Sequence, residues 1–376
     1  MAGGGHAQLG VLKALAGGSS AIEATLVTPD PYQIYSGMLP GWMAGHYDLS
    51  ECMIDLRPLA RAAGVRLVLG QVVAIDAAQR RVRLDDGTHL DYDRLSLDVG
   101  GETDTSWLAA AGEGALPVKP LSDFVQRWPG VVAAATRQQD YRLLVVGGGA
   151  AGVELAFAAQ HAFLVGGCQR ASVALVAAES GILPGHAGGV KERAFNLLRQ
   201  RGISVFRGQA VGTAQGVILS GGESLDADCV IAATGARPAA WLRGTDLARD
   251  EQGYVLVDAH HRSLSHPEVF AAGDVCVRND ICLARSGVHA VFAGPVLARN
   301  LMASIRGQAL RDYRPRKKSL YLLATGPQHA IASWGMFSAQ GHWVWRWKNW
   351  IDRRFMRRHG TDKPRRRVSR MNRGKQ

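Results

Sequence analysis

LVVGGGAAGVE, residues 144–154, places three glycines directly after a run of leucine and valine. Gly147, Gly149 and Gly152 fit the spacing GxGxxG between a predicted strand and a predicted helix. In this pattern the first glycine makes a tight turn, the second admits a pyrophosphate, and the third lets helix and strand pack closely. The free N–H groups and the dipole of the helix N-terminus favour phosphate charge. The stretch therefore predicts a dinucleotide-binding turn, with a plain packing turn as the alternative.

Strand-like and helix-like patterns alternate on both sides of this turn. Strands are expected over residues 141–146, 171–176 and 203–206, and helices over residues 153–163 and 190–201. Such alternation predicts a parallel sheet covered by helices, so the predicted fold class is α/β.

The acid that would bind the ribose of the nucleotide comes late in the sequence. The strand over residues 171–176 is followed by Ala177 and Ala178 before Glu179 appears. An acid at the strand end normally accepts hydrogen bonds from the ribose hydroxyls. Glu179 is the candidate, and a solvated loop residue is an equal alternative. The choice between NADH and NADPH stays open.

A second glycine turn opens the chain. Gly3 and Gly5 match the first two glycines of the pattern, and His6 and Ala7 follow them. Gln8 stands where the third glycine belongs, so looser packing between helix and strand is expected there.

No strand precedes the glycine turn that opens the chain, because only Met1 and Ala2 lie before it. A parallel sheet would then lack its central strand, which is buried on both faces. We expect that the true start codon lies upstream, with a truncated form as the alternative. Beyond the turn, residues 8–16 predict a helix and residues 24–27 a strand.

Two later motifs complete the pattern. Residues 232–238 read AATGARP, and residues 269–275 read VFAAGDV. Together with the two glycine turns, in this order, they resemble the pyridine nucleotide-disulfide oxidoreductase superfamily. The resemblance implies two Rossmann-like domains, FAD and NADH or NADPH as cofactors, and an NAD domain inserted in the FAD domain. It also implies that Gly235 lies at the end of the NAD domain, and that Gly273 and Asp274 bind the ribityl and pyrophosphate portion of FAD.

A narrower resemblance rests on three further stretches and the GGGHA start. Residues 31–41 read PYQIYSGMLPG, residues 44–47 read AGHY, and residues 345–356 read WRWKNWIDRRFM. They closely resemble the oxidoreductase half fused to some selenide, water dikinases, a group similar to type II NADH dehydrogenases and sulfide:quinone oxidoreductases.

This narrower resemblance implies roles for several residues. Glu154 would lie near the nicotinamide, and its alternative role is to support the dipole of the helix first turn. The residues implied to line the flavin ring are Ser36, Gly37, Pro40 and His289.

The resemblance also divides the chain. Residues 1–117 would form the first part of the FAD-binding domain, residues 118–240 the NAD(P)-binding domain, and residues 241–315 the second part of the FAD-binding domain. Residues 316–360 would form an interface or membrane-contact region, and residues 361–376 a disordered basic tail.

The five cysteines form no CxxC pair and are odd in number, which favours a reducing, cytoplasmic compartment. Cys52 stands alone where the disulfide-reductase branch has a CxxxxC pair, so dithiol chemistry is not expected. Cys276 and Cys282 are placed near the flavin by the resemblance. We find no metal-binding constellation, no secretory signal and no run of about 18 apolar residues that could span a bilayer.

The net charge of +12 is concentrated at the C-terminal end. Residues 346–376 contain 13 Lys and Arg against 2 Asp and Glu. Aromatic and aliphatic side chains recur there at near-helical spacing: Trp343, Trp347, Trp350, Ile351 and Phe355. A basic, aromatic amphipathic helix suits an anionic membrane surface. The alternatives are a strand, since Trp343, Trp345 and Trp347 alternate, or a tryptophan core.

The leading functional hypothesis is therefore an FAD-dependent oxidoreductase that takes hydride from NAD(P)H and passes electrons to an acceptor, first of all a quinone. It would be cytoplasmic or peripheral on the inner face of the cell membrane, and a homodimer is left open. A flavoprotein reductase of a selenium or sulfur compound is the second hypothesis. A non-catalytic flavin- or nucleic-acid-binding protein ranks last, and no specific nucleic acid is expected.

Overall fold

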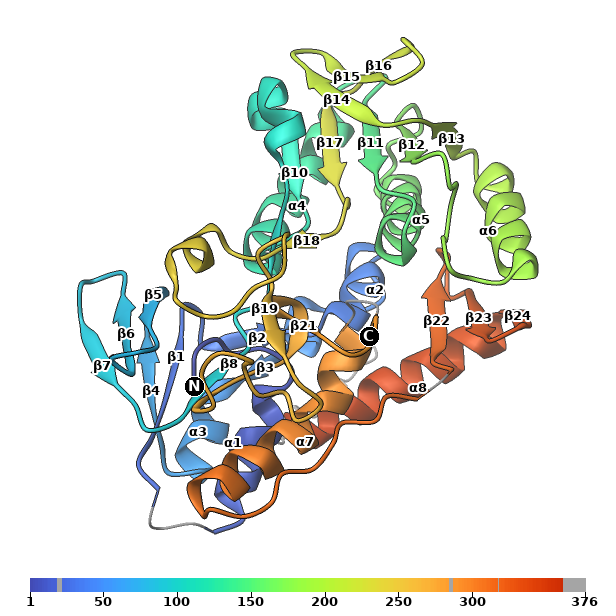
Figure 1. The fold of residues 1–376 in the computed structure, drawn as a ribbon. Coiled ribbons are helices and arrows are strands. Elements are labelled where there is room, and N and C mark those ends of the chain that lie inside the picture. The colour runs from blue at the N-terminus through green and yellow to red at the C-terminus, as the bar shows by residue number, and fades with distance from the viewer. Residues whose placement is uncertain (19–21, 284–286, 317, 361–376) are drawn as a thin grey trace, which may run out of the picture.

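The computed structural model describes residues 1–18, 22–283, 287–316 and 318–360. Figure 1 shows two lobes, each built around strands and helices, with the segment from β10 to α6 in the upper lobe and β1, α1 and α7 in the lower lobe. The chain enters the upper lobe once and returns to the lower lobe, as expected for an inserted domain.

The lower lobe contains a parallel sheet joined through the first residues of the chain. β1 (Ala24–Thr28) pairs with β4 (Val65–Leu69), and β8 (Leu95–Leu97) pairs with β20 (Val269–Ala271). Ala2 forms parallel bridges to both pairs, and its N–H donates to the Ser96 carbonyl at 2.8 Å. Residues 1–3 therefore occupy the central place that the sequence suggested would be empty.

Helices α1 (Gln8–Ala16) and α7 (Gly287–Ile305) cross at two glycines of the lower lobe. A Cβ on Gly10 would lie 2.7 Å from the Gly294 carbonyl carbon, and one on Gly294 would lie 2.9 Å from the Ala7 oxygen. By length and composition α7 could cross a membrane, contrary to the expectation that the chain has no such run. Leu297 and Leu301 are buried in the same hydrophobic cluster as α1, so one side of α7 packs in the core of the lower lobe.

The upper lobe holds a five-stranded parallel sheet in the order β10, β17, β11, β12, β13. These strands are Ala115–Pro117, Cys229–Ala232, Arg142–Val146, Ser172–Ala177 and Ser204–Arg207. The helices of this lobe are α4 (Leu121–Arg137), α5 (Ala150–Val165) and α6 (Gly188–Gln200). The α/β prediction is confirmed, whereas the exact domain boundaries stay predictions.

Smaller strand pairs complete both lobes. Antiparallel pairing joins β5 (Val72–Asp76), β6 (Arg81–Leu84) and β7 (His89–Asp91), and likewise β14 (Ala210–Thr213), β15 (Gly216–Leu219) and β16 (Ser224–Asp226). The remaining pairs are β2 (Tyr32–Ile34) with β3 (Met53–Asp55), β9 (Glu102–Thr103) with β18 (Ala236–Arg237), and β19 (Val255–Val257) with β21 (Cys276–Arg278). The short helices α2 (Leu39–Met43) and α3 (Leu56–Ala62) lie in the lower lobe.

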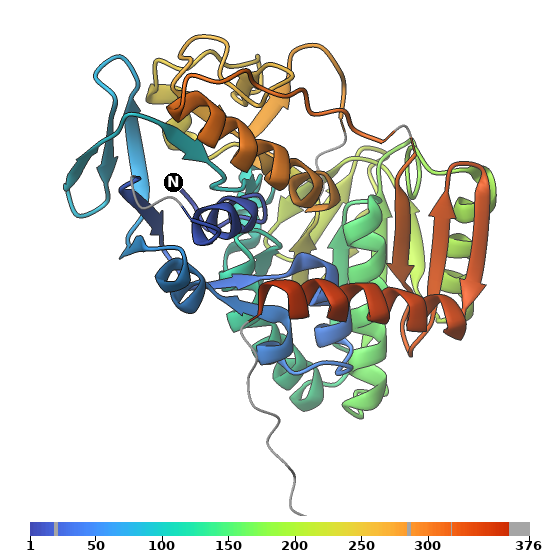
Figure 2. The ribbon, with the colours of Figure 1, turned by 90° about the horizontal axis from the view of Figure 1, so that it is seen from below.

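The C-terminal segment forms a three-stranded antiparallel sheet and a long helix. The strands are β22 (Leu320–Ala324), β23 (Ala330–Trp334) and β24 (Phe337–Gly341), and the helix is α8 (His342–His359). Figure 2 shows α8 running across the molecule between the blue N-terminal segments and this sheet. The helical alternative for the tryptophan run is thus confirmed over the strand, and the predicted disordered tail lies outside the described residues.

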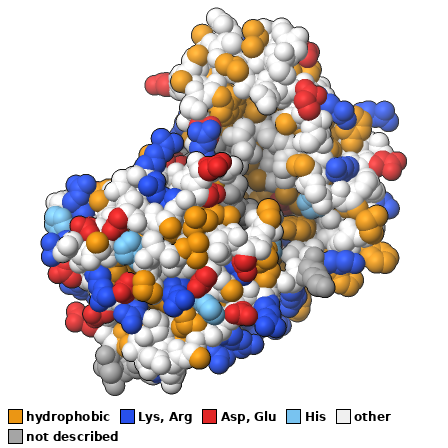
Figure 3. Space-filling model, in the orientation of Figure 1, with side chains coloured by type: hydrophobic (Ala, Val, Ile, Leu, Met, Phe, Trp, Pro, Cys, Tyr) orange, Lys and Arg blue, Asp and Glu red, His pale blue; other side chains and the backbone are white. Residues whose placement is uncertain are grey.

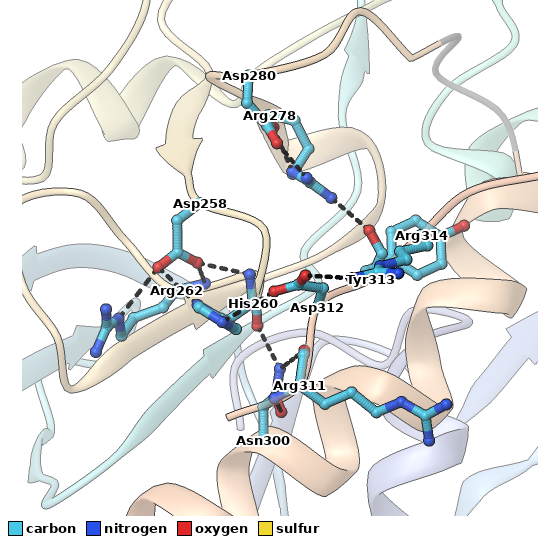
Figure 4. A network of polar contacts seen from close by, with 10 residues as sticks. All are labelled: Asp258, His260, Arg262, Arg278, Asp280, Asn300, Arg311, Asp312, Tyr313 and Arg314. Carbon is cyan, nitrogen blue, oxygen red and sulfur yellow. Dashed lines mark hydrogen bonds and ion pairs between the residues drawn. The ribbon is translucent and has the colours of Figure 1, made fainter. Parts of the chain in front are cut away.

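A polar network fastens the connection between α7 and β22 to the lower lobe (Figure 4). His260 lies between two carboxylates, with Nδ1 3.2 Å from Asp258 and Nε2 3.2 Å from Asp312. Asn300 of α7 donates to the His260 and Arg311 carbonyls. His260 therefore holds a loop of the lower lobe to this connection.

Candidate functional site

The upper-lobe glycine turn has the geometry that a dinucleotide requires. Gly147 has a φ of +134°, and a Cβ on it would lie 2.3 Å from the Ala233 oxygen. A Cβ on Gly152 would lie 1.9 Å from the Gly147 oxygen, so only glycine fits there. Gly149 faces open space, and no side chain caps α5, so the helix N-terminus is free to bind an anion.

The lower-lobe turn is pressed against a carboxylate that sequence reasoning missed. A Cβ on Gly5 would lie 2.2 Å from the Asp98 Cγ, and one on Gly3, whose φ is +87°, would lie 2.3 Å from the backbone oxygen of Asp98. Asp98 accepts the N–H groups of Ala7 at 2.7 Å and Gln8 at 3.3 Å. Burial raises the pKa of Asp98 to about 7. Its position at the end of β8, outside any recognised motif, gave no signal.

Gln8, which replaces the third glycine, is accommodated by β8. Its side chain is buried and its Nε2 donates to the carbonyl and the hydroxyl of Ser96, at 3.0 and 2.9 Å. Because the amide finds partners on the strand, the larger residue leaves no unpaired group at this position.

The residues around the lower-lobe glycine turn fit FAD. The buried Nε2 of His6 has no partner within the described part of the chain, and burial lowers the pKa of His6 to about 4. Asp274 lies near His6 and forms a short ion pair with Lys119. An unpaired ring nitrogen, a glycine cradle and a carboxylate thus meet at one helix N-terminus, where a flavin dinucleotide would place its phosphates and ribityl hydroxyls.

The segment expected to line the flavin ring meets the start of α7. A Cβ on Gly287 would lie 3.2 Å from the Ser36 hydroxyl. Pro40 is buried in the first turn of α2. His289 instead lines a groove of about 730 Å³ between α7 and the connection that follows it, together with Phe292 and Arg299. Its flavin role stays a prediction.

The side of α8 that faces the flavin segment carries a buried ion pair beside Trp345, which packs in the hydrophobic cluster of Tyr35 and Met38. Lys348 donates to the Gly37 carbonyl at 2.6 Å and to Asp352 at 2.7 Å, and both side chains are buried. The Tyr35 hydroxyl donates to Asp352 at 3.2 Å, and the Tyr35 ring stacks on Phe355. Burial lowers the pKa of Lys348, but Asp352 and Glu154 raise it more, to a value above the usual one. The hydrogen bonds from Lys348 to Gly37 and from Tyr35 to Asp352 fix α8 against the flavin segment, and the ion pair within α8 joins the two.

Glu154 connects the upper lobe to the C-terminal sheet. Its carboxylate accepts a hydrogen bond from the N–H of Ala324 at 2.7 Å, and the charge of Lys348 on α8 attracts it. Burial raises the pKa of Glu154 to about 7, and Lys348 and the hydrogen bond limit the rise. A carboxyl poised between its two protonation states near neutral pH can take up or release a proton. The dipole alternative is weakened, because the carboxylate is engaged by β22 and α8.

The other predicted residues are spread more widely. Gly235 has a φ of +103° and precedes β18, which pairs with β9. Gly273, whose φ is +79°, lies on the Asp98 carboxylate, since a Cβ on it would meet that oxygen at 2.5 Å. Glu179 is exposed beyond the end of β12.

The cysteines show no redox pair among the described residues. Cys52, Cys168, Cys229 and Cys276 are buried and Cys282 is exposed, all with free thiols. Cys276 does lie near the lower-lobe site, because the charges of Asp98 and Asp274 affect its thiol. Burial raises the pKa of this thiol well above the usual range. A buried thiol that keeps its proton is a poor nucleophile. Within the described residues, no cluster of three or more His, Cys, Asp or Glu side chains is arranged to hold a metal ion.

Fold and sites together define a two-dinucleotide oxidoreductase class, and the comparisons identify the family. The family model "Pyridine nucleotide-disulphide oxidoreductase" matches residues 2–294, so the chain belongs to this family. Members bind FAD and NAD(P)H, which confirms the cofactors and the enzyme class expected from the sequence at the level of the family. The resemblance to dikinase fusions stays a prediction.

Curated relatives and solved structures agree with this assignment. The chain is 31% identical to an NADH dehydrogenase-like protein of Mycobacterium tuberculosis (strain H37Rv) over 238 residues, covering 61% of this chain and 59% of that protein. It thus spans about three fifths of the length of that relative. It is 30% identical to putidaredoxin reductase of Pseudomonas putida over 294 residues, covering 72% of this chain and 64% of that protein.

Two solved structures show the same fold at low sequence identity. The sulfide:quinone oxidoreductase of Aquifex aeolicus superposes with a TM-score of 0.78 at 14% identity, covering 95% of this chain and 90% of that chain. NDH2 of Plasmodium falciparum, solved in complex with NADH, superposes with a TM-score of 0.76 at 13% identity, covering 94% and 97%.

The variant Asp274→Ala is expected to lose FAD. Removing a carboxylate that accepts hydroxyl hydrogen bonds should weaken flavin binding by about tenfold to a hundredfold. The measurement is the flavin absorbance per protein after purification and dialysis. Asp91→Ala, which removes an exposed ion-paired aspartate on β7, is the control and should keep its flavin. Full flavin retention by Asp274→Ala would refute the assignment.

Glu154 should make stability depend on pH near neutrality. The folded protein holds this proton up to about pH 7, whereas the ordinary pKa is 4.5. Because the folded state binds the proton more tightly, the stabilisation is present below pH 4.5 and is lost as the pH rises to about 7. Relative to Glu154→Gln, the wild type should therefore lose about 1 to 3 kcal/mol of unfolding free energy across this window.

Urea unfolding of both proteins at pH 5 and pH 8 measures this difference. The control is Glu192→Gln, which removes an exposed carboxylate on α6 and should not alter the dependence. An equal wild-type-to-variant difference at both pH values would show that the pKa of Glu154 is not raised.

Proposed function

We propose that this chain is an FAD-dependent NAD(P)H oxidoreductase that passes electrons to a quinone at a membrane surface. The oxidoreductase part is supported by the two glycine turns and by the family. The quinone and the membrane are supported by one observation in particular, which is the distribution of side chains on α8.

The flavin would supply the two-electron chemistry when bound. The chain's own residues hold and orient the reactants. The upper-lobe glycine turn would hold phosphates at the uncapped N-terminus of α5, the lower-lobe turn would hold those of FAD beside His6, and Asp274 and Lys119 would receive the ribityl portion. Glu154, held by Ala324 and next to Lys348, stores a proton that an acceptor such as a quinone needs on reduction. Figure 3 shows the surface hollowed between the two lobes, where NAD(P)H would enter.

Helix α8 buries two charged side chains and exposes three of its tryptophans. Its buried positions include Lys348 and Asp352, whereas Trp343, Trp347 and Trp350 are 57%, 39% and 51% exposed. Tryptophan side chains combine an apolar ring with a polar N–H, so they prefer the boundary between lipid headgroups and acyl chains.

Cations surround this tryptophan face. Arg346 is exposed beside it, and Arg354 stacks over the Trp350 ring at 5.5 Å. The β23–β24 hairpin, which leads into α8, adds the exposed side chains of Trp334, Met336 and Phe337. Aromatic side chains flanked by arginines are the pattern of a helix that lies in an anionic membrane surface.

The other hypotheses have weaker support. A selenium or sulfur reductase that used a thiol would need a reactive cysteine, and four of the five thiols are buried. A soluble electron carrier is the acceptor that the name of putidaredoxin reductase suggests for that relative. An inner-face location, a homodimer and the absence of a specific nucleic acid stay predictions.

The double variant Trp347→Ser/Trp350→Ser tests the quinone and membrane proposal. Wild type should float with phosphatidylglycerol vesicles and reduce a long-chain quinone embedded in them. Removing two interfacial aromatics should weaken vesicle binding by about tenfold or more. The rate with a water-soluble short-chain quinone should stay the same, because the variant leaves the cofactor sites intact.

Phe195→Ser is the matched control, since it removes an exposed aromatic side chain from α6. It should bind vesicles like the wild type. If the wild type does not bind anionic vesicles, the membrane proposal is wrong. If NAD(P)H reduces its flavin but neither the long-chain nor the short-chain quinone is reduced, the quinone proposal is wrong.

A further inference from the structure

We propose that the nicotinamide cofactor is NADPH and that Arg207 binds its 2′-phosphate. The inference rests on the proposed function, because it names the donor for the same upper-lobe site. It is carried by three features at the carboxyl edge of the upper sheet: a strand end without an acid, an arginine on the neighbouring strand, and a turn that joins both to the glycine turn.

The strand that normally ends in a ribose-binding acid ends here in alanine. β12 finishes at Ala177, which is fully buried, and the exposed Ala178 follows it. In dinucleotide-binding domains the acid at this position accepts hydrogen bonds from the 2′-hydroxyl and repels a 2′-phosphate. Neither alanine can do either, so the strand end itself does not discriminate against the phosphorylated nucleotide.

Arg207 occupies the neighbouring strand end. It is the last residue of β13 and pairs with Ala177 in the parallel register. The N–H of Gly208 donates to the Ala177 carbonyl at 2.9 Å, which holds the two strand ends together. A guanidinium nitrogen of Arg207 lies 3.9 Å from the place that a Cβ on Gly181 would take, so the cation extends over the turn that follows β12.

This turn also touches the phosphate-binding glycines. It is closed by the Gly181 N–H, which donates to the Ala178 carbonyl at 2.8 Å. The Leu183 N–H donates to the Gly148 carbonyl at 2.6 Å, and a Cβ on Gly148 would lie 2.7 Å from the Ala177 Cβ. The glycine turn, the strand end and Arg207 therefore line one continuous edge, along which the pyrophosphate and the adenosine ribose of a bound dinucleotide would lie.

The charge of Arg207 is available to a ligand. Its side chain is exposed, and no ion pair involves it among the residues that the structure describes, whereas Arg142 and Arg170 of the same lobe are paired with aspartates. A guanidinium matches the geometry of phosphate oxygens and binds them in a bidentate manner. Glu179 is the acid that follows the end of β12. If its carboxylate accepted hydrogen bonds from the ribose, it would favour NADH, so the experiments below include a Glu179 variant.

Two measurements on the purified flavoprotein test the inference. The first compares NADPH and NADH as electron donors, as kcat/KM with ferricyanide as the artificial electron acceptor. The second uses calorimetry to compare binding of 2′,5′-ADP and 5′-AMP, which differ at the 2′-phosphate and require no flavin chemistry. We expect NADPH and 2′,5′-ADP to be preferred by about tenfold or more, the effect of a charge-assisted contact to one phosphate.

Variants assign the preference to Arg207. Arg207→Ala should raise the KM for NADPH and abolish the preference for 2′,5′-ADP over 5′-AMP, and Arg207→Lys should restore part of it. Arg199→Ala removes an exposed arginine near the C-terminus of α6, which leads away from this edge, and should leave both preferences unchanged. Glu179→Gln should not reduce binding of either nucleotide.

The outcomes separate the inference from the function. If NADH reduces the flavin as well as or better than NADPH, and 2′,5′-ADP binds no tighter than 5′-AMP, the inference fails while the oxidoreductase function stands. If Glu179→Gln weakens NADH binding, the acid holds the ribose and the inference also fails. If 2′,5′-ADP binds through Arg207 but neither nucleotide reduces the flavin, the phosphate site is supported and the proposed function fails.

Discussion

Both candidate sites depend on backbone contacts that only glycine permits. The oxygen of Gly147 lies 1.9 Å from where a Cβ of Gly152 would be, and the oxygen of Asp98 lies 2.3 Å from where one of Gly3 would be. These contacts bring the start of a helix directly over the end of a buried parallel strand. The N-terminus of α5 is left uncapped, whereas Asp98 already accepts two N–H groups at the start of α1. The two turns thus share a backbone plan but differ in electrostatics.

Helix α8 links the two sites, because it contacts the segment expected to carry the flavin ring and its Lys348 lies near Glu154 of α5, the helix that follows the upper-lobe glycine turn. Lys348 binds the carbonyl of Gly37 and lies near Glu154, whose carboxylate is held by Ala324. The energetic consequence is that α8 buries an ion pair, which is costly unless both charges are fully hydrogen-bonded. Trp343, Trp347 and Trp350 remain exposed on its outer side, and this arrangement leads to the proposal of a membrane surface.

Much of the fold could be predicted from local patterns. The helix over residues 8–16, the glycine turn at 147–152 and the alternating strands of the upper lobe follow from periodicity and glycine spacing, and the structure has them within a few residues. Long-range contacts could not be predicted. Residues 1–3, through which Ala2 pairs with Val27 and Leu97, are too few to show the alternating pattern of a strand in the sequence. The burial of Lys348 and the role of Asp98 depend on partners about 310 and 90 positions away, respectively.

The proposed reaction is the reduction by NAD(P)H of a flavin that is held by the lower lobe. It is tested by the absorbance spectrum of the purified protein, recorded anaerobically before and after addition of NADH or NADPH. We expect a bound flavin whose absorbance bleaches with at least one of the two nucleotides. A fully bound flavin that responds to neither nucleotide would contradict the proposal.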